Sequence, residues 1–294
     1  MQRNAPKIFV LIGLVFFIVA GGLLFRQHFN DPENVFYDML RGNVTTSGVS
    51  RSVTQEGPGQ SLIQKSQLQT GETNIVAGRT DLRQGNEQSE TTIVTERTGT
   101  PAQDYVRYAA ISTDEVTQSG EEFDFSNVVG QWGLSPASGE MTRGGELFGE
   151  ATLGIVPFGK LDRWQTEKLI EEIKERNVYG VDFSAVERAL VDGRPTYRYR
   201  AQIQSDRYVR MLQLFGGYIG TSQLSDLNPE EFANNPPIAI DFEVDVWSRQ
   251  LVTASFVNSE RVEDYTAYGA WREVKLPEDT VPISELQQRL QQVQ

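Results

Sequence analysis

The sequence predicts an α+β fold in which helices cover one face of an antiparallel β-sheet, preceded by a single N-terminal transmembrane helix. Every second residue from 238 to 246 is a large apolar side chain, and the residues between them are Ala239 and three carboxylates, the alternation of a half-buried strand. The predicted elements run as a short helix, several strands, a helix, a strand, a helix and final hairpin strands, an order that favours an antiparallel sheet with helices on one side. Residues 8–25 form an uncharged apolar run of about 18 residues, near the minimum for crossing a ~30 Å hydrocarbon core.

The composition limits the classes of function. The chain has 294 residues, of which 38% are hydrophobic, so it can build one large or two small domains with a core. The formal net charge of −13 argues against a nucleic-acid partner, since phosphate contacts need clustered Lys and Arg. The absence of cysteine excludes disulfides, thiol catalysis, thiolate metal sites and a cysteine-linked lipid anchor.

Residues suited to catalysis or metal binding are scarce. The single histidine, His28, lies beside the apolar run, which excludes a Ser-His-Asp triad or a histidine-ligated zinc site in the rest of the chain. Asp241, Glu243 and Asp245 lie on the polar side of one alternating strand, where carboxylates usually face water. We therefore predict no catalytic residue, no metal ligand and no cofactor.

The apolar run predicts a membrane anchor. Arg3 and Lys7 precede it, so the positive-inside tendency favours a cytoplasmic segment 1–7, a signal anchor over 8–26 and an extracytoplasmic remainder. This arrangement corresponds to a single-pass protein of the bacterial plasma membrane. The alternative is a signal peptide cleaved near the small residues of "VAGG".

The first part of the remainder predicts a helix followed by strands. Asp31 can cap a helix that begins at Pro32 and ends at Gly42. From Asn43 to Ile111, stretches rich in Thr, Ser, Val and Gln read as successive antiparallel strands, with turns at "EGPGQ" and "RQGNEQ". The alternative for this region is a partly disordered Ser/Thr linker. Residues 112–160 read as a long excursion with turns, whose glycines match neither a phosphate loop nor a dinucleotide fingerprint.

The second part alternates helices and strands. A helix capped by Asp162 carries an apolar stripe that consists of Trp164, Leu169, Ile170 and Ile173. A strand over 196–203 precedes a helix that begins near Ser205 and is expected to break at Gly216-Gly217. A hairpin turns at 247–250 and returns over Leu251 to Phe256, a final strand follows near 261, and 281–294 is a polar C-terminal tail or short helix.

Two stretches carry a resemblance to a known family. "YRYRAQIQSDRYVRMLQLFGG" and "IAIDFEVDVWSRQLVTASFVNSERVEDYTAYG" resemble parts of the bacterial lipoprotein-carrier superfamily of LolA- and LppX-like proteins. The resemblance implies that residues 30–280 form a curved antiparallel sheet, an open half-barrel covered by helices, with an apolar space for lipid or acyl chains. The chain departs from the family in having a predicted anchor and no lipidated cysteine.

The resemblance also suggests a ligand-binding face. Its candidate residues are the inward-facing side chains of the late strands: Tyr197, Tyr199, Phe242, Val244, Val246 and Phe256. The alternative is that these side chains are ordinary core. The function expected is that of a membrane-tethered extracytoplasmic binding protein for lipid or acyl-chain ligands. The alternative is a sensing or protein-interaction domain of the cell envelope with a filled core and an unidentified protein partner.

Overall fold

A computed structural model describes residues 30–71, 74–85, 89–117, 120–136, 146–191, 193–221, 224–225, 227–271 and 273–293. The predicted anchor at Ile8–Phe25 and the predicted cytoplasmic segment lie outside these ranges. Among the described residues, no helix has the length and the apolar character needed to cross a bilayer.

The described residues form an α+β fold with one 13-stranded, mostly antiparallel sheet. The strands are β1 (Gly48–Gly57), β2 (Gln60–Gln69), β3 (Ile75–Gly85), β4 (Glu90–Gly99), β5 (Gln103–Thr113), β6 (Trp132–Pro136), β7 (Tyr179–Val181), β8 (Glu187–Val191), β9 (Arg194–Ile203), β10 (Ile238–Asp245), β11 (Leu251–Phe256), β12 (Arg261–Thr266) and β13 (Thr280–Pro282). The helices are α2 (Pro32–Thr45), α3 (Glu146–Thr152), α4 (Arg163–Glu175), α5 (Ser205–Ile219) and α6 (Ile283–Val293), with single 3₁₀ turns at Phe183–Ala185 and Pro229–Phe232.

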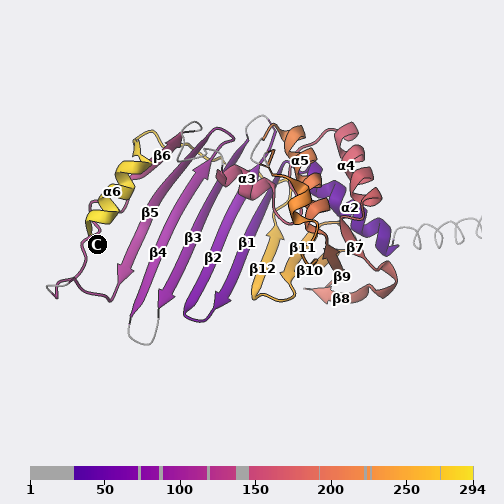
Figure 1. Cartoon of the computed structure of the whole chain (residues 1–294), viewed down its shortest axis with the longest axis horizontal. Helices are drawn as coiled ribbons and strands as arrows, with labels where there is room; N and C mark the ends of the chain where they lie inside the picture. Colours follow the sequence, from indigo (N-terminus) through magenta and orange to yellow (C-terminus); the bar gives the residue numbers. More distant parts are fainter. Residues whose placement is uncertain are drawn as a thin grey trace, which may run out of the picture.

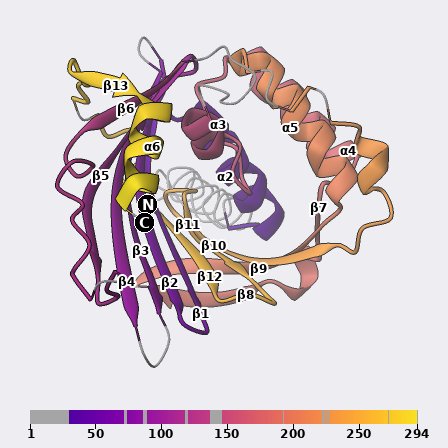
Figure 2. The same ribbon diagram turned by 60° about the vertical axis from the view of Figure 1, so that its left-hand side comes forward.

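The sheet is open and curved. Its order is β13-β6-β5-β4-β3-β2-β1-β12-β11-β10-β9-β7, with β8 paired to β9. Figure 2 shows that the strands bend around a hollow that contains α2 and α3. Helices α2, α4 and α5 gather over the end of the sheet formed by β7 to β12, while much of β2 to β5 faces the same hollow without a layer of long helices (Figure 1).

The first helix follows its sequence signals at its start but not at its end. The Asp31 carboxylate accepts a hydrogen bond from the Asn34 N–H at 3.1 Å, and Pro32 occupies the first turn. The helix does not end at Gly42 as predicted but continues to Thr45. A glycine inside a helix costs only about 1 kcal/mol, and the burial of Val44 against the core offsets it.

A second predicted helix break is also wrong. Helix α5 runs through Gly216-Gly217 to Ile219 and ends at Gly220, whose φ of 76° is the left-handed conformation that glycine adopts at a helix C-terminus. A Cβ on Gly216 would lie 3.2 Å from the Thr221 side chain. This glycine therefore lets the chain pack closely as it leaves the helix.

The Thr- and Ser-rich region from Gly48 onward forms paired strands rather than a linker, and its first residues, 43–45, belong to α2. Strands β1 to β5 pair in chain order as an antiparallel meander. The turn signals at 56–60 and 83–88 separate β1 from β2 and β3 from β4. The predicted stretch from Ser61 to Leu82 contains two strands, β2 and β3.

Most of the predicted inward face of β10 is buried. Ile240, Phe242, Val244 and Val246 lie in the core, but Ile238 is exposed because it begins the strand at the margin of the sheet. Asp245, predicted to face water, is also buried. Its Oδ1 accepts hydrogen bonds from the backbone N–H groups of Trp247 and Ser248 at 2.8 and 2.9 Å, which fixes the hairpin turn.

The helix α4 differs from its predicted stripe at one residue. Asp162 and Gln165 form a reciprocal capping box, and Leu169, Ile170 and Ile173 are buried. Trp164, however, is 63% exposed. It lies in the first turn, beyond the edge of the core, where its ring meets that of Tyr218 edge to face at 6.2 Å.

Residues 112–160 contain strand and helix that the sequence patterns did not indicate, whereas the short helix that was one expectation for residues 281–294 is present as α6, preceded by the unexpected strand β13. Residues 112–160 supply β6 and α3, and α3 packs on β2, β3 and β4 through its buried Leu147, Phe148 and Ala151. The C-terminal residues form β13, which pairs with β6 in parallel, and α6, which packs on β6. A Cβ on Gly133 of β6 would lie 2.8 Å from Ile283 and 3.1 Å from Leu286, so this glycine allows α6 to dock closely.

Candidate functional site

The six residues predicted to bind a ligand fall into two environments. Tyr197, Tyr199, Phe242, Val244 and Val246 are buried in the main core, and Phe256 is partly exposed. The ring of Phe36 on α2 lies 5.2 Å from that of Tyr199 and 6.2 Å from that of Phe242. The Tyr197 and Tyr199 hydroxyls donate to the carbonyls of Asn30 and Pro32. Tyr197, Tyr199 and Phe242 therefore pack the start of α2 onto the sheet, and the ligand role of all five buried residues stays a prediction.

Phe256 instead lines a groove between α3, α5 and the sheet. The groove has a volume of about 540 Å³. Its apolar lining includes Leu153, Ile155, Leu224 and Phe256, and its charged lining includes Arg51, Arg261 and Glu263. The groove thus combines the apolar surface of a small-molecule site with a few fixed polar groups.

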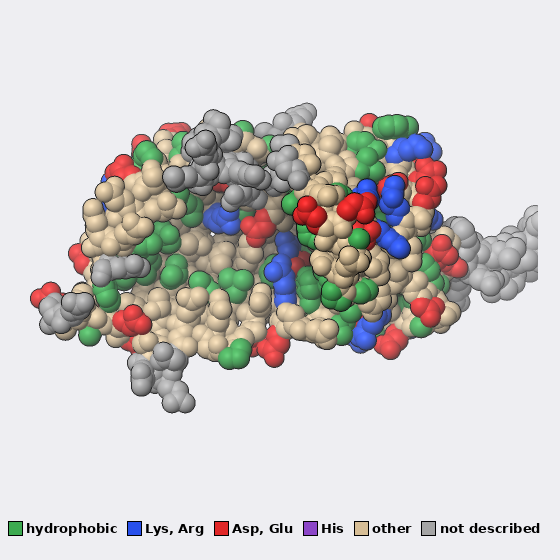
Figure 3. Space-filling view, viewed as in Figure 1, with side chains coloured by type: hydrophobic (Ala, Val, Ile, Leu, Met, Phe, Trp, Pro, Cys, Tyr) green, Lys and Arg blue, Asp and Glu red, His purple; other side chains and the backbone are tan. Residues whose placement is uncertain are grey.

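An apolar row crosses the sheet beside this groove. We define the apolar row as Leu62 of β2, Leu82 of β3, Ile93 of β4 and Ile111 of β5, which are direct cross-strand partners. Each of the four is only partly buried. Leu62 shares its face with Gln64, whose amide contacts Glu150 of α3, so the row faces the concave side. Figure 3 shows hydrophobic side chains on the floor of the hollow on this side.

The far end of the apolar row reaches α6. Ile93, Ile111 and Tyr108 line a space of about 240 Å³ together with Phe123, Phe125 and Leu290. Because Leu290 belongs to α6, the C-terminal helix closes this end of the concave face. The apolar row therefore extends from Leu62 on β2, two strands away from Arg261 of the groove, to the space beside α6.

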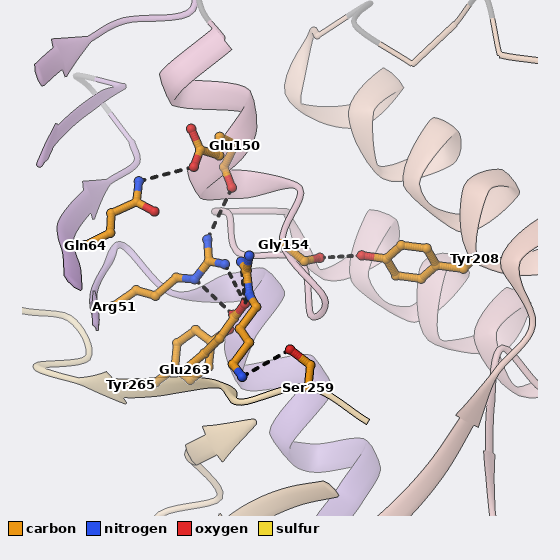
Figure 4. Close-up of polar contacts among 9 residues, drawn as sticks. Arg51, Gln64, Glu150, Gly154, Tyr208, Ser259, Glu263 and Tyr265 are labelled. Carbon is orange, nitrogen blue, oxygen red and sulfur yellow. Dashed lines mark hydrogen bonds and ion pairs between the residues drawn. The ribbon is translucent and has the colours of Figure 1, made fainter. Parts of the chain in front are cut away.

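A buried charge cluster lies on β1 and β12, beyond the β2 end of the apolar row. Arg51 Nε and Nη2 donate to the two oxygens of Glu263 at 3.0 and 2.8 Å. Arg261 Nε donates to Glu263 Oε1 at 2.9 Å, and the Tyr265 hydroxyl donates to Oε2 at 2.5 Å. The Glu263 side chain is 1% exposed and that of Arg51 is 9% exposed. Figure 4 shows this cluster below α3.

The electrostatics of the cluster follow from its two arginines. Burial alone would raise the pKa of Glu263, but the positive charge of Arg51, hydrogen bonds from Arg51 and Tyr265, and the charge of Arg261 lower the pKa below its usual value. Burial and the nearby Glu263 charge raise the pKa of Tyr265 well above its usual value, so its hydroxyl stays a donor. Glu263 is therefore a carboxylate held between two cations.

Helix α3 is held over the sheet by polar contacts at its C-terminal end. The Glu150 carboxylate accepts hydrogen bonds from Gln64 at 3.1 Å and Arg97 at 3.3 Å, and its backbone carbonyl lies 3.5 Å from Arg51 Nη1. Just beyond the helix, the Gly154 carbonyl accepts a hydrogen bond from the Tyr208 hydroxyl of α5 at 2.6 Å (Figure 4). These contacts hold α3, which forms the roof of the groove opposite the sheet, in place.

The sequence contains an indication of this charge cluster that the prediction of strands did not use. Arg51 stands between Val49 and Val53, so an alternating strand places a charge on its apolar face. Glu263 stands in the same way two residues before Tyr265. Two charges of opposite sign at inward positions of separate strands indicate a buried pair, since an unpaired buried charge is costly.

A larger space lies on the opposite face of the sheet. It has a volume of about 710 Å³ beneath the segment that links β12 to β13, and its charged lining includes Lys65, Arg79, Glu96, Glu273 and Lys275. The charges suit a polar occupant rather than an acyl chain. Within the described ranges, no group of three or more Asp, Glu, His or Cys side chains is arranged to hold a metal ion.

Comparison with known proteins gives a distant likeness of fold. No protein-family model matches the chain. No curated protein matches it in sequence. Among solved structures, the crystal structure of LprF from Mycobacterium bovis is similar with a TM-score of 0.42 and 12% sequence identity, over 85% of this chain and 97% of that chain.

Proposed function

We propose that the protein is a non-enzymatic binding protein for a ligand with an acyl chain, held on the concave face of the sheet. The observation that carries this proposal is the apolar row, which lies partly exposed on the floor of a hollow. Soluble proteins seldom leave contiguous apolar surface to water without a partner or ligand for it. Covering such surface gains roughly 25 cal/mol per Å².

The helices support a binding role in a second way. Helices α2, α4 and α5 cover β9 and β10, and the inner-face side chains of these strands are buried in the main core without a ligand. Over β2 to β5, the cover in the described part of the chain comes from the seven-residue α3, from Phe123 and Phe125, and from α6 at the edge of the sheet. An acyl chain laid between α3 and α6 would complete this half of the molecule.

We also propose that the N-terminal apolar run tethers this domain to the bacterial plasma membrane from outside. The Asn30 carbonyl is bound by Tyr197 near the β8–β9 hairpin. Four residues, 26–29, separate Phe25 from Asn30, so the five Cα–Cα steps of the tether span at most ~17 Å. The exposed side chains of Leu190 and Trp247 lie at this same end of the sheet and suit a position near lipid.

Native mass spectrometry of the gently purified full-length protein tests the binding proposal. We expect co-purified lipid, or uptake of added oleic acid by protein stripped of lipid. The double variant Leu82→Gln, Ile93→Gln should lose most of this uptake because it places amides in the middle of the apolar row. The matched control is Ile63→Gln, which changes an exposed residue on the opposite face of β2 and should leave uptake intact.

The alternative function is a cell-envelope sensing or protein-interaction domain. The burial of five of the six residues first predicted as ligand contacts favours this reading, because that part of the core is full. A protein that purifies without lipid and takes up no oleic acid would support it and would refute the acyl-chain proposal. Equal uptake by the double variant and Ile63→Gln would show that binding occurs away from the apolar row.

A further inference from the structure

We infer that Arg261 binds an acidic headgroup, so that the ligand is an anionic amphiphile with a carboxylate or phosphate at one end. This inference rests on the proposed acyl-chain function and adds which end of the ligand is charged and which way the ligand lies. It follows from the sharing of Glu263 by two arginines and from the register of the strands.

Two arginines share one carboxylate at the sheet side of the groove. Arg51 and Arg261 both donate to Glu263, so these three side chains carry a local excess of one positive charge. The other charged residue described in the groove lining is Glu150, which balances the lining as a whole, but its carboxylate contacts Gln64 and Arg97 instead. The chain as a whole carries −13. A negative group that approached Arg261 would therefore meet a local positive charge in a protein that is acidic elsewhere.

The arginine that the ligand would meet first is Arg261. Its side chain is 34% exposed, whereas Arg51 below it is 9% exposed. Arg261 uses Nε and Nη2 on a single oxygen of Glu263. Its guanidinium carbon lies 5.5 Å from the ring of Phe256, which also lines the groove. Guanidinium groups bind carboxylate and phosphate through paired, charge-assisted hydrogen bonds.

The register places this headgroup site in line with the apolar row. Gln55 of β1 pairs with Arg261 on one side and with Leu62 on the other. The cross-strand row therefore reads Arg261, Gln55, Leu62, Leu82, Ile93 and Ile111. Five strand spacings of ~4.8 Å give a path of about 24 Å from the arginine to the last isoleucine. An extended oleoyl chain is comparable in length, so its head would sit at Arg261 and its tail would end beside α6.

The test compares two probes that share one chain and differ in the head. Binding of oleic acid and of oleyl alcohol to the lipid-free full-length protein is measured at pH 8 by calorimetry. We expect the wild type to bind the acid about tenfold or more tightly than the alcohol, the range expected for charge-assisted hydrogen bonds. Arg261→Gln should remove this preference by weakening the binding of oleic acid while leaving the binding of oleyl alcohol unchanged.

The matched control is Arg41→Gln. Arg41 of α2 is also 34% exposed and forms an ion pair with Glu167 of α4, away from the groove. The variant should therefore retain the preference for oleic acid over oleyl alcohol. Equal affinity of the wild type for acid and alcohol, or equal weakening of both by Arg261→Gln, would overturn the headgroup site while leaving the acyl-chain function standing. Failure of both probes to bind the wild type would refute the acyl-chain function itself.

A final experiment distinguishes an amphiphilic ligand from a small free anion. Acetate and inorganic phosphate at millimolar concentration should leave oleic acid binding unchanged, because neither can cover the apolar row. Displacement of oleic acid by either small anion would contradict the assignment of an amphiphile. Thermal unfolding of each variant accompanies the measurements, so that a loss of affinity is not confused with a loss of fold.

Discussion

Replacing Glu263 by glutamine is the sharpest test of the buried charge cluster. The carboxylate accepts from Arg51 at 3.0 and 2.8 Å, from Arg261 at 2.9 Å and from the Tyr265 hydroxyl at 2.5 Å, and it is 1% exposed. Glutamine keeps the shape but removes the negative charge, and its amide presents a donor where donors already converge. Removing one partner of a buried ion pair costs about 3–5 kcal/mol because the other charge stays buried.

Urea unfolding of the purified full-length protein at pH 7, followed by far-UV circular dichroism, measures this change. With a slope of about 3 kcal/mol/M, the midpoint should fall by roughly 1–1.7 M. The control is Glu167→Gln, because Glu167 is an exposed partner of Arg41, and a surface pair contributes only about 0–1 kcal/mol. A Glu263→Gln midpoint indistinguishable from that of Glu167→Gln would show that the cluster is not a buried, mutually dependent unit.

The remaining predictions concern pH, packing and the membrane. Because the folded-state pKa of Glu263 lies below its usual 4.5, its stabilising contribution is present above that pH and is lost as pH falls through the lower, folded-state value, so wild type and Glu263→Gln should converge in urea midpoint at acid pH; a constant difference down to pH 3 would contradict this. Val244→Trp should destabilise the protein by about 1–3 kcal/mol in the same urea assay, because Val244 is fully buried; an unchanged midpoint would indicate spare space beside β10. Deleting residues 1–29 should move the protein from the membrane fraction to the soluble fraction on sedimentation of cell extracts, and a truncated protein that still sediments with membranes would contradict the proposed tether.

The late strands were predictable because their side chains alternate strictly. Residues 240, 242 and 244 on β10, and 197, 199, 201 and 203 on β9, are buried where period 2 places them. The same periodicity could not separate core from ligand surface, since both require apolar side chains on the inner face. Which of the two applies depends on whether a helix covers the strand. Helix α2 does so over Phe242, and no helix of comparable length in the described ranges covers Leu82.

The groove escaped prediction for a different reason. Its roof is α3, a helix of only 7 residues, too short for a helical period to be recognised beside the glycine-rich segment before it. Its charge pair joins Arg51 to Glu263 across 212 positions in the sequence, a separation that no local pattern spans. The exposure of Trp164 and the course of α5 past Gly216 likewise depend on neighbours that local sequence does not reveal.

A crystal structure of the full-length protein with oleic acid would show directly where the ligand binds. We expect density for the acyl chain along Leu62, Leu82, Ile93 and Ile111 on the concave face, with the carboxylate within hydrogen-bonding distance of Arg261. An occupied protein whose ligand lies instead among Tyr199, Phe242 and Val244, or on the opposite face beneath the β12–β13 segment, would contradict this expectation.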